Sequence, residues 1–210
     1  MRDRDTTLKK IKHEVIEMCL RKGWGDNGIQ NPQHVTMAMV VEAMELLEHF
    51  VCLTPAEEAA LCTGGMRDER IEIAEEMSDV LMYSMQLMYT LNVDVSRALC
   101  GELSDECSTI VQLKECAGSG DNGLKEQAMR VGIKSRFVLE EFQWMNDADV
   151  AELMKGLWPK KAADAGKAFA ALFREILILA NRLDIDIAAA IARKIAIVDK
   201  RVYPDDDPVR

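Results

Sequence analysis

The sequence lacks the features of several protein classes. Positive charge is in deficit, since the 210 residues carry a formal net charge of -10. This balance argues against a nucleic-acid polymer or an anionic membrane as partner. A free nucleotide fits, because its bound metal ion would supply local positive charge. Charged residues interrupt the longest apolar runs well before a membrane-spanning length, so we expect no transmembrane helix.

Metal-type cysteine spacing is absent as well. The six cysteines form no C-x-x-C pair and no Cys/His cluster with zinc spacing, and no signal peptide opens the chain. We therefore expect reduced, mostly buried thiols in a cytoplasmic protein.

The alternation of apolar and polar residues that is typical of strands is missing, whereas helical periodicity is nearly continuous. A first helix should begin at Thr6 or Thr7 as cap and stop at Gly23. Three longer helices are expected over about 32–50, 67–91 and 95–115, with a short one in TPAEEAAL. The sequence therefore predicts an all-α fold, an antiparallel helical bundle.

Two apolar stretches, MAMVVEAMELLEHF and IEIAEEMSDVLMYSMQLMY, each contain a pair of acids three residues apart. The pairs are Glu42 with Glu45 and Glu76 with Asp79. On a helix such residues lie one turn apart on one face. Each pair should therefore lie at or beside the face that packs inward, and the apolar neighbours Val41, Met44, Met77 and Val80 leave little room for a purely polar face.

Carboxylates beside a buried face are costly unless a positive group meets them, and four of them on two facing helices suit Mg²⁺. The structural alternative is the solvated side of an amphipathic helix. One pair alone would favour that alternative, but two matching pairs favour a metal site.

These motifs resemble those of the MazG-like all-α nucleoside triphosphate pyrophosphohydrolases, which carry Glu-x-x-Glu on one helix and Glu-x-x-Asp on a later one. EAMELLEHF looks like the first element and EEMSDVLMY like the second, with Tyr83 one turn after the aspartate; RKGW supplies an upstream Trp24. The resemblance covers about residues 9–99. It implies Mg²⁺-dependent hydrolysis of an NTP or dNTP to the monophosphate and pyrophosphate, with Mn²⁺ as a substitute ion.

The resemblance also implies roles for individual residues. Glu42, Glu45, Glu76 and Asp79 would be both the metal ligands and the catalytic acids. Substrate-binding candidates are Trp24, Tyr83, Gln33 and His34. The structural alternatives are a core position for the tyrosine, a loop anchor for the tryptophan and an exposed helix start for the histidine. We expect His13 and His49 to be surface groups.

The second half repeats the first. LNVDVSRAL at 91–99 matches LDIDIAAAI at 183–191, and Phe142 follows Phe50 at the same offset of 92 residues. We expect a tandem pair of MazG-like four-helix units over 1–116 and 94–210, which share the helix 94–116 and pack as one domain.

The second unit has lost its acids. At an offset of 92 the four acidic positions become Lys134, Phe137, Ala168 and Ala171. Conversely, Lys194 corresponds to Glu102 of the first unit. We therefore hypothesise a composite site in which a base of the second half reaches the triphosphate held by the first. The candidates are Arg193, Lys194, Lys200 and Arg201. The alternative is that these are basic residues favoured by the helix dipole.

The family commonly assembles as dimers or tetramers, so the resemblance implies a homodimer. A non-catalytic helical interaction or regulatory protein is the alternative function, because half of the molecule has lost its acids. A di-iron carboxylate bundle would need Glu-x-x-His pairs, which the acid motifs lack.

Overall fold

The computed structural model describes residues 1–25 and 30–201. Within them every regular element is helical, apart from one isolated bridge between Thr7 and Thr109, so the all-α prediction is confirmed. The elements are η1 (Asp3–Asp5), α1 (Leu8–Lys22), α2 (Pro32–Val51), α3 (Pro55–Cys62), α4 (Arg67–Thr90), α5 (Val95–Cys100), α6 (Ile110–Ala117), α7 (Leu124–Glu140), α8 (Asp147–Met154), α9 (Pro159–Arg182) and α10 (Ile187–Lys200). None of these helices is long and apolar enough to pass through a bilayer.

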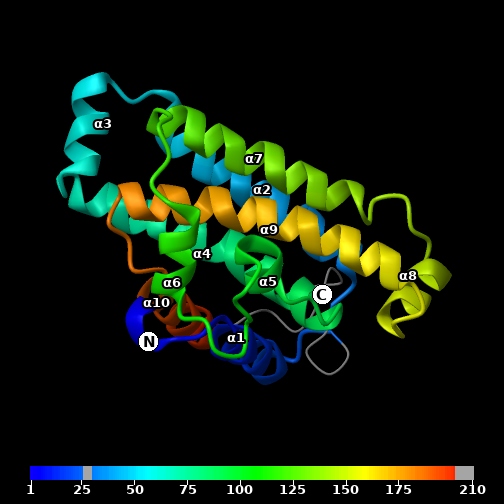
Figure 1. The fold of residues 1–210 in the computed structure, drawn as a ribbon. Coiled ribbons are helices and arrows are strands. Elements are labelled where there is room, and N and C mark those ends of the chain that lie inside the picture. Colours follow the sequence, from blue (N-terminus) through cyan, green and yellow to red (C-terminus); the bar gives the residue numbers. More distant parts are fainter. Residues whose placement is uncertain (26–29, 202–210) are drawn as a thin grey trace.

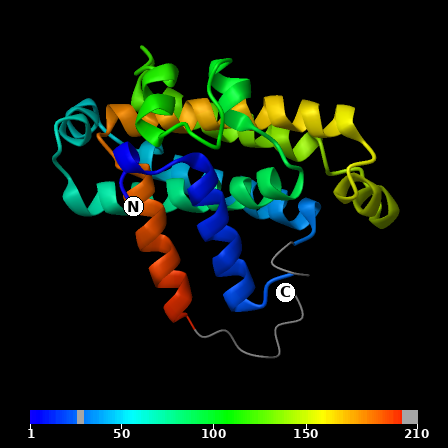
Figure 2. The same cartoon turned by 60° about the horizontal axis from the view of Figure 1, so that its bottom comes forward.

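Four long helices form the body of the molecule (Figure 1). Helix α2 packs on α4, α7 packs on α9, and α2 and α7 lie side by side. The interior between them holds Met39, Phe50, Phe169 and Phe173, all fully buried. Figure 2 shows α1 and α10 as a pair that lies across one face of this body, where both contact α4.

The predicted bounds of the first helices are confirmed because their signals are local. Thr7 is the N-cap of α1 and its side chain accepts a hydrogen bond from the Lys10 amide. Gly23 ends the helix in the left-handed region, with φ of 68°, a conformation that glycine adopts at little cost. The short helix in TPAEEAAL is α3, which begins with a capping box between Thr54 and Glu57.

The prediction of one helix over 95–115 is wrong. Helix α5 ends before Gly101, which has φ of 71°, and α6 begins only at Ile110. Asp105 folds back between them and accepts hydrogen bonds from the Ser96 amide at 2.7 Å and from Lys12 Nζ at 2.5 Å. This non-local capping breaks the segment, so no single helix can be shared by two units.

The expectation for the cysteines is also wrong. The turn between α5 and α6 brings Cys100 and Cys116 together, with Cα atoms 6.1 Å apart and a disulfide between them. Among the free cysteines Cys19 is buried, whereas Cys52, Cys62 and Cys107 are exposed. Spacing alone does not reveal such a pairing, since the approach depends on the turn.

The two halves of the chain make matching contacts. Helix α1 packs on α4 as α6 packs on α9, and α10 packs on α4 as α5 packs on α9. The turns before α5 and α10 match as well, because Asn92 and Asp184 have φ of 50° and 49°. In this arrangement α6, and not α5, takes the place of α1. The tandem repeat itself stays a prediction, but each half clearly places its last helix on the other half.

Helix α10 is anchored at both ends. At its start the Ala188 amide donates to Asp3 Oδ1 at 2.7 Å. At its end Asp199 pairs with Arg21 at 2.8 Å, and Lys22 donates to the carbonyl oxygen of Arg201 at 2.9 Å. These contacts fix the position of α10 relative to α1 and therefore to α4.

Candidate functional site

The acids of the two motifs meet between α2 and α4. One carboxylate oxygen from each of Glu42, Glu45 and Glu76 lies within 4.8 Å of the others. Since α2 and α4 pack along their length, the three-residue spacing on each helix directs the side chains to one place. Three carboxyl groups are thus concentrated in a small volume.

The reasoning about their apolar neighbours was partly wrong. Met77 and Val80 are buried, but Val41 is 54% exposed and Met44 is exposed too. The inward face of α2 is formed instead by Val35, Met39, Ala43, Leu46 and Phe50. Glu42 and Glu76 are half-buried and Glu45 is exposed, so the acids lie at the rim of the helix interface.

Asp79 has a different partner. Its carboxylate forms an ion pair with the ammonium group of Lys194 from α10. Only 7% of Lys194 is exposed, an unusual position for a lysine unless it is paired. The second half of the chain therefore places a base beside the acids of the first half.

These groups line a pocket of about 310 Å³. Trp24 and Tyr83 contribute aromatic surface to it, and Arg201 adds a second cationic side chain. The remaining lining residues are Met18, Glu42, Glu45, Glu76, Asp79, Met82, Gln86, Lys194 and Val198. Acidic, basic and aromatic groups thus converge in one cavity.

Other candidates from the sequence lie elsewhere. Gln33 donates to the Met145 carbonyl at 2.5 Å, and His34 is exposed at the start of α2, so neither lines this pocket. Arg193 lines a different cavity, together with Arg2, Arg67 and Arg70. Lys200 is exposed and does not reach the acids.

One polar lining residue was missed by the sequence prediction. Gln86 is 3% exposed and accepts a hydrogen bond from the Gln30 side chain at 3.2 Å. Its spacing gave a signal, because Gln86 lies seven residues after Asp79 and therefore on the same face of α4.

Burial and mutual repulsion disfavour the charged forms of these acids. Burial, and then the charges of Asp79, Glu45 and Glu76, raise the pKa of Glu42 to about 7. Burial followed by the Asp79 charge also raises the pKa of Glu76. For Asp79, burial raises the pKa although the hydrogen bond from Lys194 opposes it. Without another cation the cluster is under electrostatic strain.

The donor set fits a hard divalent cation. Glu76 Oε2 is buried and has no hydrogen-bond partner, which is costly for a carboxylate oxygen. The other donors are carboxylate oxygens as well, the ligand type that Mg²⁺ and Mn²⁺ prefer. A cation here would satisfy that oxygen and offset the repulsion.

Comparison with known proteins gives a distant similarity. Two curated proteins, both named dCTP pyrophosphatase 1 and from Rattus norvegicus and Homo sapiens, are each 29% identical to this chain over 99 residues. The match covers 47% of this chain and 56% of each relative. No family model matches the sequence, and no solved structure matches it significantly. The similarity supports a distant relationship to the MazG-like pyrophosphatases and does not bear on a second copy of the unit.

We predict that the metal-free protein is destabilised by rising pH through Glu42. Its pKa is about 7 in the folded chain and near 4.5 in a model peptide, so between these pH values the folded state holds a proton that the unfolded state has released. The stabilisation is complete below about 4.5 and is lost as the pH rises through about 7. We expect urea unfolding in EDTA to show that, between pH 5 and pH 8, the unfolding free energy of Glu42→Gln rises by about 1–2 kcal/mol relative to that of wild type. This value allows for solvent screening.

Glu48→Gln is the matched control, because Glu48 lies on the same helix and is exposed. The prediction would be contradicted if the difference in unfolding free energy between wild type and Glu42→Gln stays constant with pH.

Proposed function

We propose that this protein is a Mg²⁺-dependent nucleoside triphosphate pyrophosphohydrolase that converts an NTP or dNTP and water to the monophosphate and pyrophosphate. The observation that carries the proposal is the pocket in which three carboxylates meet beside Lys194 and two aromatic side chains. The similarity to proteins named dCTP pyrophosphatase supports it. By that analogy, pyrimidine deoxynucleotides are the first substrates to test.

In this proposal Glu42, Glu45, Glu76 and Asp79 would hold the cation, and a cation there would offset phosphate charge and lower the pKa of a bound water. Water oxygen attacks the α-phosphorus, the bond from that phosphorus to the bridging oxygen breaks, and pyrophosphate leaves. A carboxylate of the cluster takes the proton of the water. Trp24 and Tyr83 stack against the base, and the buried amide of Gln86 is suited to hydrogen bond with its polar edge.

Lys194 has a second role in the proposal. An ammonium group has three N–H donors, so one can remain with Asp79 while another donates to a phosphate oxygen. Arg201, which also lines the pocket, offers a planar fork that suits phosphate. The first half of the chain would bind the metal and the second half the phosphates.

The first test is pyrophosphate release from a panel of ribo- and deoxynucleoside triphosphates. We expect activity with Mg²⁺ or Mn²⁺, none in EDTA, and a decrease in kcat of at least about 100-fold in Glu76→Gln, because one charge-stabilising ligand is lost. Glu48→Gln should retain wild-type rates. A folded wild type that binds Mg²⁺ but cleaves no member of the panel would favour the non-catalytic alternative.

The second test concerns the base from α10. Lys194→Ala should lower kcat/KM by about 10- to 100-fold, the value of a charge-assisted hydrogen bond, mainly through KM. Arg193→Ala is the matched control, since Arg193 is the neighbouring base on α10 and lies outside the pocket. Circular dichroism should confirm that both variants fold. Unchanged KM and kcat in Lys194→Ala would remove this residue from the mechanism.

The third test concerns assembly as a homodimer. Exposed apolar side chains continue from α2 to the adjacent α7, at Met37, Val41, Met44, Met129, Ile133 and Phe137. Met129 and Ile133 lie 92 residues after Met37 and Val41, so the patch has matching halves. A two-fold interface would bring this patch against the same patch of a second copy.

Light scattering should give twice the 23.6 kDa chain mass. The double variant Val41→Lys, Ile133→Lys should have the mass of a single chain. Leu157→Lys, which changes an exposed apolar residue that is not part of the patch, should keep the mass of the dimer. A wild-type monomer at micromolar concentration would contradict the dimer.

A further inference from the structure

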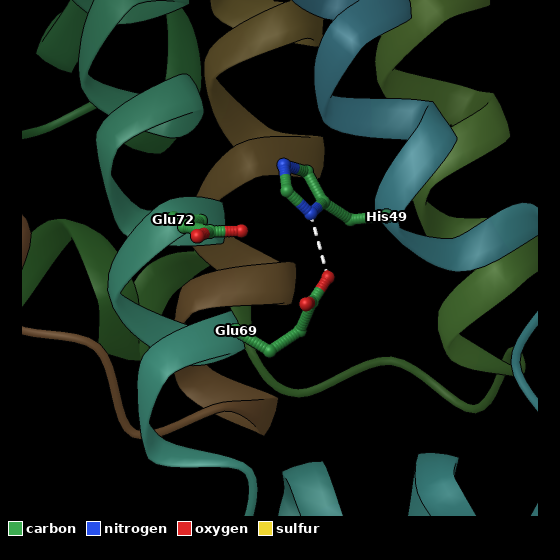
Figure 3. Close-up of side chains that lie close together, drawn as sticks. All are labelled: His49, Glu69 and Glu72. Carbon is green, nitrogen blue, oxygen red and sulfur yellow. Dashed lines mark hydrogen bonds and ion pairs between the residues drawn. The ribbon is translucent and has the colours of Figure 1, made fainter.

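A second group of metal-ligating side chains lies between α2 and α4, outside the pocket. It comprises His49 on α2 and Glu69 and Glu72 on α4, and Figure 3 shows the three side chains converging across the gap between the helices. One ligand atom from each lies within 4.8 Å of the others. The prediction that His49 is a surface group is wrong, because only 19% of its side chain is exposed.

The group is adjacent to the acid cluster but separate from it. His49 lies four residues after Glu45, and Glu72 lies four residues before Glu76, so each is one helical turn further toward α3. None of His49, Glu69 and Glu72 lines the pocket that holds Lys194 and Trp24.

The donor set differs from that of the acid cluster. It offers one imidazole nitrogen and two carboxylates, and imidazole suits Zn²⁺ and other transition ions, whereas Mg²⁺ prefers oxygen alone. Ligand atoms about 2.1 Å from an ion lie roughly 3–4 Å from one another in a tetrahedral shell. The three ligand atoms all lie within 4.8 Å of one another, so side-chain adjustment without movement of either helix can bring them into such a shell.

We propose that His49, Glu69 and Glu72 bind a divalent transition-metal ion, with Zn²⁺ as the representative. Glu72 is exposed, which leaves a path for entry and room for a water molecule as fourth ligand. An ion held in this way connects α2 to α4 next to the acid cluster. The proposal does not depend on pyrophosphohydrolase activity.

The competing explanation is a simple ion pair. His49 Nδ1 lies 2.6 Å from Glu69 Oε1, and this contact needs no metal. The ion pair forms between His49 and Glu69 without Glu72, whereas a metal ion would bind Glu72 as the third protein ligand. Glu72 is therefore the residue that separates the two explanations, and its exposure means that a substitution there does not threaten folding.

The test is a Zn²⁺ titration of the tag-free full chain followed by NMR of the histidine ring nitrogens. The sequence contains three histidines, so His13 and His34 serve as internal controls for His49. Glu76→Gln is the background, because it removes a carboxylate of the acid cluster and leaves His49, Glu69 and Glu72 in place. We expect the His49 nitrogen resonances alone to shift with Zn²⁺ and to remain unchanged with an equal concentration of Mg²⁺.

The affinity is read from the His49 shift itself, so that Zn²⁺ bound at exposed cysteines does not contribute. Glu72→Gln in the same background should weaken it at least tenfold, since one of three protein ligands is lost. Glu17→Gln is the matched control, because Glu17 lies beside His13 in a pair that lacks a third ligand. An unshifted His49, or an affinity that Glu72→Gln leaves unchanged, would overturn the proposal and leave only the ion pair.

Discussion

The ion pair between Asp79 and Lys194 is the contact on which the candidate site depends. Both side chains are largely buried, and removing one partner of such a pair costs about 3–5 kcal/mol, because the other charge stays desolvated. The pair can form only if α10 lies across α4 at the observed place. Contacts of Asp3 with the start of α10 and of Arg21 with its end hold it there. The geometry of the pocket therefore depends on how α10 is anchored.

The crossing of helices between halves explains why the loss of acids in the second half need not abolish a site. Because α10 packs on α4, the acids and the base of the observed pocket come from different halves. The contact of α5 with α9 is the corresponding one at the second position. At the second position Ala171 corresponds to Asp79 and Glu102 to Lys194, so neither charge of the pair is retained. A fused chain that needs only one of two equivalent sites would keep the acids and the base at one position and lose them at the other. This interpretation rests on the predicted repeat and on the proposed function.

Sequence patterns predicted what is determined locally and failed where contacts are distant. Caps at Thr7 and Gly23 and the apolar periodicity of α2 and α4 lie within a few residues of the features they specify. The break between α5 and α6 depends on Asp105, which is bound by Lys12 of a distant helix. The exposure of Val41 has a similar cause: α2 is apolar on more than one side, and periodicity alone does not say which side meets α4. The Cys100–Cys116 disulfide likewise depends on the turn between α5 and α6, whereas the seven-residue spacing of Gln86 from Asp79 was a local signal.

The interface between α2 and α4 arranges ligands by type along its length. Since both helices are regular, positions four residues apart repeat the same cross-helix approach, so Glu45 and Glu76 face one another and, one turn on, His49 faces Glu72 and Glu69. A further acid in place of His49 would extend an array of carboxylates in which burial, and then mutual repulsion, already raise the pKa of Glu42 and Glu76. The charge of His49 instead acts to lower the pKa of Glu76. In the proposed site, its imidazole would favour transition-metal ions at this end of the interface. One helix pair would then carry an oxygen-only group for the proposed Mg²⁺ beside a nitrogen-containing group for the proposed transition-metal ion.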